Sequence, residues 1–115
     1  MKGQPFLRRL GFALNGLRTA AQRESSFRTH LLAVVAVVVA LCLIRPAPAW
    51  WAIGLLTVGL VLVAELLNSA LETLADRLHP EQHPEIRMAK DMAAAAVLVA
   101  TVTALIVAAI FILGR

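Results

Sequence analysis

The chain has 115 residues, of which 60% are hydrophobic and only 16% are charged, a composition typical of membrane proteins. A chain of this length with several long apolar runs can form one small helical bundle, which excludes an additional soluble catalytic domain. The formal net charge of +4 does not indicate nucleic-acid binding, because the chain lacks the soluble basic face that such binding needs. We therefore expect one all-α membrane domain over residues 1–115.

The first segment, residues 5–26, is predicted to be an amphipathic helix that lies on the membrane surface. Apolar residues recur at helical spacing from Phe6 to Ala21, and arginines occupy positions between them. Each basic residue near anionic headgroups contributes about 1 kcal/mol to binding, so such a helix would bind the lipid surface. A solvated basic tail is the alternative interpretation.

Three apolar runs follow, and we expect each of them to cross the membrane. Residues 92–113 contain no charged side chain and reach the length of about 20 residues that a span needs. Residues 50–71 begin with two tryptophans, which are typical of the membrane interface. Residues 31–44 are a short run, and a span there requires an extension in which Arg28 snorkels to the surface. The expected spans are residues 28–45, 50–76 and 86–113.

A signal peptide is the rival interpretation of the first apolar run. Basic residues precede this run, and residues 47–49 read Ala-Pro-Ala, with the small residues of a cleavage site. The preceding segment is too long and too regularly patterned for the n-region of a signal peptide. Pro46 and Pro48 more simply indicate a tight turn between two spans.

The basic residues predict the orientation in the membrane. Nine of the eleven lysines and arginines precede the first span or separate the second from the third, and only Arg45 and Arg115 lie on the other side. The positive-inside rule therefore predicts a cytoplasmic N-terminus and an external C-terminus.

A polar stripe runs out of the second apolar run. Its members are Glu65, Asn68, Glu72 and Asp76, and at 100° per residue they fall within an arc of about 80° on one helix face. An ionisable side chain within a span costs several kcal/mol unless it faces protein or water, so Glu65 is a candidate functional residue.

The stripe continues from the bilayer to its surface, where other charged residues are expected to lie nearby. Glu24 precedes the first span, and Lys90 and Asp91 open the third. Surface carboxylates can hold Mg²⁺ together with substrate phosphates, and a lysine can neutralise phosphate charge. These groups meet the needs of phosphoryl transfer, with Glu65 as the natural general base for a lipid hydroxyl.

The sequence resembles the small prokaryotic diacylglycerol kinase family. The resemblance is carried by residues 65–72 (ELLNSALE) with Asp76, by residues 89–97 (AKDMAAAAV) and by residues 16–28 (GLRTAAQRESSFR). It implies a lipid kinase with three spans in the bacterial cytoplasmic (inner) membrane, which phosphorylates diacylglycerol with ATP and Mg²⁺. It also implies a homotrimer whose active sites are shared between neighbouring subunits.

The same resemblance implies a role for individual residues. Glu65 corresponds to the catalytic base, Glu65 and Ala94 to substrate-binding positions, and Glu24 and Glu72 to metal-binding carboxylates. The implied ATP-binding residues are Arg8, Arg9, Glu24, Asn68, Glu72, Asp76, Glu81, Gln82, His83, Lys90 and Asp91.

Other functions fit parts of the sequence. An undecaprenol kinase of the same family is the first alternative, because Ala93 and Ala94 stand where diacylglycerol-specific members usually have Gly-Ser, and because His30 and His83 look closer to that branch. A small proton-coupled transporter or a rotor subunit also uses an intramembrane glutamate, but one acid suffices for it. A purely structural assembly protein leaves the polar stripe unexplained, although Asn68 could simply join helices by hydrogen bonds.

Overall fold

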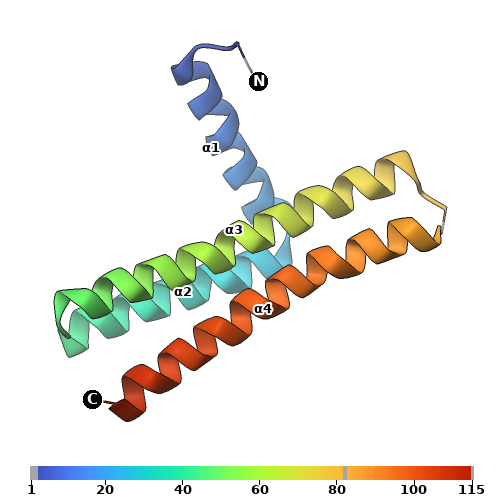
Figure 1. The fold of residues 1–115 in the computed structure, drawn as a ribbon. Helices are drawn as coiled ribbons and strands as arrows, with labels where there is room; N and C mark the ends of the chain where they lie inside the picture. Colours follow the sequence, from blue (N-terminus) through green and yellow to red (C-terminus); the bar gives the residue numbers. More distant parts are fainter. Residues whose placement is uncertain (1–2, 82, 115) are drawn as a thin grey trace.

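The computed structural model describes residues 3–81 and 83–114, and four helices account for most of them. The expected all-α fold is confirmed, and three of these helices are long and apolar enough to cross a membrane. The helices are α1 (Phe6–Arg23), α2 (Ser25–Ile44), α3 (Pro48–Leu78) and α4 (Pro84–Gly114). In Figure 1, α2, α3 and α4 form the bundle and α1 projects away from it. That α1 lies on a membrane surface stays a prediction.

The break between α1 and α2 occurs at Glu24. Its backbone is extended (φ −108°, ψ 108°), and its N–H donates to the Ala20 carbonyl at 2.9 Å. The guanidinium of Arg28 donates to the carbonyl oxygens of Ala21 and Gln22 at 2.9 and 3.1 Å. These carbonyls belong to the last turn of α1 and lack partners within the helix. Arg28 belongs to the start of α2, and its side chain therefore caps the end of α1.

The turn between α2 and α3 has the geometry that its prolines predict. Arg45 adopts the left-handed conformation (φ 54°, ψ 56°) and donates its N–H to the Leu41 carbonyl, which ends α2. Pro46 follows and disfavours a helical conformation at the residue before it. Pro48 occupies the first turn of α3, where its missing N–H costs nothing.

The connection between α3 and α4 is short and non-helical. Helix α3 ends at Leu78, and α4 begins at Pro84. Pro80 lies between them, and a proline inside a helix would remove a backbone hydrogen bond and clash with the preceding turn. The two longest helices therefore pack as an antiparallel hairpin, and α2 packs on α3.

Few side chains are buried within a single chain. Phe27 of α2 is the largest fully enclosed side chain among the described residues, at 2% exposure. Most large aliphatic side chains of the three long helices are exposed. Because α2, α3 and α4 have the composition of membrane spans, these outer faces are suited to contact lipid or other helices.

Candidate functional site

Glu65 is the buried carboxylate of the bundle, with an exposure of 4%. Its Oε1 accepts a hydrogen bond from the Ser26 hydroxyl at 2.9 Å. Its Oε2 lies 3.6 Å from Nδ1 of His30. Both partners come from α2, one helical turn apart. A buried carboxylate needs such partners, because an unpaired charge away from water is strongly unfavourable.

The break between α1 and α2 at Glu24, hereafter the elbow, brings these two partners to Glu65. Since α2 begins immediately after the elbow, Ser26 lies in its first turn and His30 in its second. Phe27, between them in sequence, is buried and anchors the start of α2. Glu24 itself is half-buried.

Asn68 lies one turn beyond Glu65 on α3. Its Oδ1 is buried and has no hydrogen-bond partner among the residues that the structure describes. A buried amide oxygen without a partner costs about 1–3 kcal/mol. A ligand that brings a donor or a cation to Oδ1 would recover that free energy.

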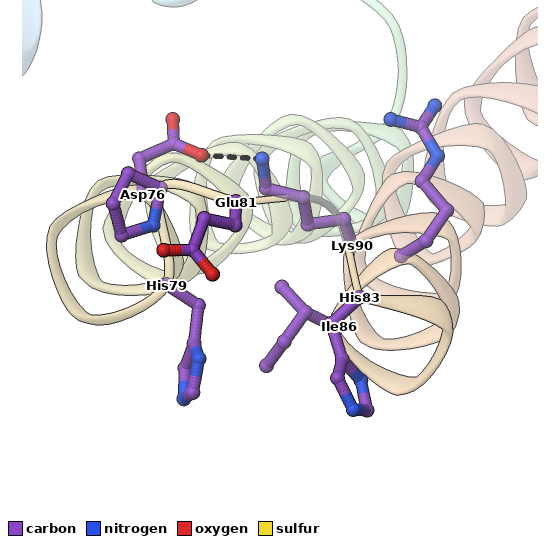
Figure 2. Close-up of a pocket in the computed structure, with 8 residues that line it drawn as sticks. Asp76, His79, Glu81, His83, Ile86 and Lys90 are labelled. Carbon is purple, nitrogen blue, oxygen red and sulfur yellow. Dashed lines mark hydrogen bonds and ion pairs between the residues drawn. The ribbon is translucent and has the colours of Figure 1, made fainter.

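A second group of polar side chains lies where α3 and α4 meet. Lys90 of α4 donates to Oδ1 of Asp76 on α3, and Figure 2 shows the ammonium reaching across to this carboxylate with Glu81 close by. The two residues border a pocket of about 100 Å³. The pocket is lined by Asp76, His79, Pro80, Glu81, His83, Ile86, Arg87 and Lys90.

His83 has a defined orientation at the start of α4. Its Nδ1 lies 3.1 Å from the backbone nitrogen of Glu85 and accepts a hydrogen bond from that N–H. In the neutral ring the proton is therefore on Nε2, which remains able to donate. The imidazole thus satisfies an N–H of the first turn of α4 and keeps a donor for a ligand.

The remaining predicted residues do not form one cluster within the chain. Glu72 and Asp91 are exposed, and Asp91 Oδ1 lies 3.3 Å from Nε of Arg87 one turn earlier on α4. Ala94 is exposed on α4, and Arg8 and Arg9 are exposed on α1, which projects from the bundle. Within residues 3–81 and 83–114, no group of three or more potential ligands could hold a metal ion. Gln82 lies outside the described residues.

Sequence reasoning did not assign roles to Ser26 and His30 at Glu65, or to His79 and Arg87 in the pocket. One signal for the first two was present. Ser26 and His30 are four residues apart and immediately precede an apolar run, so they share a helix face that needs a polar partner.

The fold and this site define a class: an integral membrane protein with a buried carboxylate in its bundle and a pocket of mixed charge at one end. Residues 11–112 match the family model described as prokaryotic diacylglycerol kinase. The chain belongs to this family, and it is accordingly an enzyme of the phosphotransferase class.

Named relatives support the same assignment along most of the chain. A diacylglycerol kinase of Escherichia coli K12 is 38% identical over 96 residues, which is 84% of this chain and 79% of the relative. A diacylglycerol kinase of Pseudomonas aeruginosa is 35% identical and covers 98% of this chain and 95% of its own length. An undecaprenol kinase of Bacillus subtilis is 32% identical, with coverages of 96% and 89%.

Proposed function

We propose that this protein is an ATP-dependent lipid kinase that transfers the γ-phosphate of MgATP to the primary hydroxyl of diacylglycerol. The observation that carries the proposal is Glu65, a carboxylate enclosed between α2 and α3 at 4% exposure on the helix that also contributes to the α3–α4 pocket. A general base for a lipid hydroxyl has to sit within the bundle, where the lipid can approach it from the side. The family and the names of the relatives support a lipid kinase, and the role of Glu65 is our proposal.

In the proposed reaction, Glu65 accepts the proton of the lipid hydroxyl. The hydroxyl oxygen forms a bond to the γ-phosphorus as the bond between that phosphorus and the β,γ-bridging oxygen breaks. The electron pair of the broken bond remains on ADP, and the lipid product is phosphatidic acid. Positioning and charge stabilisation supply most of the catalysis in such transfers.

The pocket between α3 and α4 supports a nucleotide-binding role. Lys90 would release Asp76 and pair with a phosphate, since an exposed ion pair contributes little to stability and exchanges easily. His83 keeps a donor at Nε2, and Glu81 lies at the pocket wall. We assign ATP contacts to these residues and to Glu24, Asn68, Glu72, Asp91, Gln82 and one or both of Arg8 and Arg9.

We assign Glu24 and Glu72 as the residues that would hold Mg²⁺, because carboxylate oxygens are among the ligands that this ion prefers. Mg²⁺ commonly uses one or two carboxylates together with waters and substrate phosphates, so it does not need a cluster of three protein ligands. When bound, the ion would supply charge neutralisation on the phosphates. Glu24 at the elbow and Glu72 on α3 would hold the ion, and the ion would offset the repulsion between these carboxylates and the polyphosphate.

We further infer a homotrimer with active sites shared between subunits, in the bacterial inner membrane with the N-terminus in the cytoplasm. The exposed apolar faces of the long helices and the projecting α1 support an assembly. The distribution of lysine and arginine supports the orientation.

Undecaprenol is the alternative lipid substrate. The Bacillus subtilis relative, named as an undecaprenol kinase, matches 96% of this chain. Both lipids present a primary hydroxyl, so the roles of Glu65 and the pocket would be the same for either. Ala94 is the proposed contact on the lipid side.

Transfer of labelled γ-phosphate from MgATP in detergent micelles tests the function, with diacylglycerol and undecaprenol offered in parallel. We expect labelled phosphatidic acid from the wild-type chain and a loss of turnover of at least about a hundredfold in Glu65→Gln, because removal of a general base typically costs this much. Labelled undecaprenyl phosphate instead would change the assigned substrate. Folded wild-type protein that labels neither lipid would refute the kinase and favour a transporter.

A further inference from the structure

Two side chains of α2 contact the Glu65 carboxylate, and none of the roles assigned above uses them. The Ser26 hydroxyl lies 2.9 Å from Oε1, and Nδ1 of His30 lies 3.6 Å from Oε2. Each carboxylate oxygen therefore has a different neighbour. Both side chains lie on the same face of α2, and this face is directed toward α3.

The hydrogen positions follow from the acceptors. A carboxylate accepts, so the Ser26 hydroxyl donates to Oε1. Nδ1 of His30 lies 2.9 Å from the Ser26 carbonyl oxygen, which can only accept, so Nδ1 carries a hydrogen. The separation of 3.6 Å from Oε2 exceeds a hydrogen bond. Oε1 is thus the firmly bonded oxygen, and Oε2 keeps its lone pairs for another donor beside an imidazole N–H.

We propose that Ser26 and His30 are positioning residues for Glu65, which fix its carboxyl plane so that Oε2 receives the proton of the lipid hydroxyl. This inference rests on the proposed kinase function. A general base works only within hydrogen-bond reach of the proton it takes, and a small misplacement lowers the rate strongly. A glutamate side chain has several rotatable bonds, and a bond from a neighbouring helix to Oε1 restricts them. His30 also holds the Ser26 backbone through the contact between Nδ1 and its carbonyl.

The two contacts have a simpler structural consequence, because they join α2 to α3. If the two contacts were only a structural clamp, their removal would lower stability and would affect substrate binding and turnover alike. A positioning role instead lowers kcat and leaves the KM for lipid and for MgATP nearly unchanged, because the lost interaction acts on the reacting proton. The two roles are therefore distinguishable by kinetics.

Steady-state kinetics of the full chain in lipid-containing micelles test the proposal. For Ser26→Ala we expect kcat to fall about tenfold, the effect of losing one hydrogen bond to a charged group, with both KM values within about twofold of wild type. Ser26→Thr keeps a hydroxyl and should restore most of kcat. His30→Leu should lower kcat in the same way, and His30→Asn, which places an amide N–H where Nδ1 lies, should recover it.

Thr29→Val is the matched control. Thr29 is exposed on α2, and its hydroxyl donates to the Ser25 carbonyl of its own helix at 3.1 Å. Its removal should therefore leave kcat and both KM values at wild-type levels. Unchanged kcat in both Ser26→Ala and His30→Leu, with an active wild type, would overturn the positioning role and leave the kinase function intact.

An infrared measurement tests the contact without turnover. The carboxyl band of Glu65, identified in ¹³C-glutamate-labelled protein by its absence in Glu65→Gln, should shift in Ser26→Ala and return in Ser26→Thr. A band that does not move would refute the hydrogen bond and with it the proposal.

If Ser26→Ala fails to fold, the comparison of His30→Leu with His30→Asn decides the question. If the wild-type chain transfers no phosphate to either lipid, the kinase function fails and the positioning role falls with it.

Discussion

Asn68 differs in its environment from its polar neighbours on α3. Glu65, one turn earlier, accepts a hydrogen bond from Ser26, and Asp76, two turns later, pairs with Lys90. The buried Oδ1 of Asn68 has no such partner among the described residues. A protein retains an unpaired buried group most readily where a ligand completes it, at the expense of stability in the ligand-free state.

Asn68→Leu should therefore separate stability from activity. Leucine removes the unpaired oxygen and fills a similar volume, so the free energy of unfolding should stay the same or rise by up to about 1–3 kcal/mol. Turnover with MgATP and lipid should fall at least about tenfold because the ligand loses a contact. Unfolding in SDS, followed by circular dichroism beside the phosphate-transfer assay, checks both expectations. A clear loss of stability would indicate that Asn68 joins helices instead.

The contrast between the stripe and its partners shows what sequence can predict at this scale. Helical periodicity fixes which side chains share one face, so the row from Glu65 to Asp76 could be recognised without a structure. Periodicity does not reveal how a neighbouring helix is rotated about its axis, or at which residues two helices come into contact. The contact of Glu65 with Ser26 and His30 depends on both, and so does the pairing of Asp76 with Lys90.

At the scale of elements, α2 and α3 approach each other closely at Gly54. A Cβ atom on Gly54 would lie 3.2 Å from Cδ1 of Leu41, whose side chain is buried. A Cβ on Gly59 would meet nothing within 4 Å. Both glycines occur in the same apolar run, and the sequence gives no indication of which one faces another helix. The long apolar helices α3 and α4 were predictable from length and apolar composition, whereas the run at residues 31–44 is short and needed an extension to count as a span.

Substitution at the two glycines should have unequal effects on the bundle. Gly54→Val places bulk against Leu41, and such overpacking costs about 1–3 kcal/mol of unfolding free energy. It should also lower turnover, since it moves α2 and therefore the two residues that contact Glu65. Gly59→Val is the matched control, with the same change in a more open place on the same helix. Reversible unfolding in mixed micelles measures the difference, and equal losses at both positions would refute the close approach.

At the scale of the whole molecule, a single chain does not bring all the proposed site residues together. The buried Glu65 and the pocket at Lys90 lie on the bundle, whereas Arg8 and Arg9 lie on α1, which projects away from it (Figure 1). The three long helices also expose most of their large apolar side chains. A symmetric ring of identical subunits would cover part of this surface and would allow α1 of one chain to reach the pocket of the next. Neither the arrangement nor the number of subunits follows from periodicity or composition.

Complementation between inactive chains tests the shared site. The double variant Arg8→Ala/Arg9→Ala removes the α1 cations, Lys90→Met removes the pocket cation, and each should be nearly inactive alone. Suppose that one active site takes its α1 cations from one chain and its pocket cation from the next. In a randomly mixed oligomer, roughly a quarter of the sites would then have both groups intact, so up to that fraction of wild-type turnover should be recovered. Lys90→Met mixed with Asp76→Asn is the control, since these residues pair within one chain and should restore nothing. Absence of recovery in the first mixture, despite verified co-assembly, would place each complete site within a single chain.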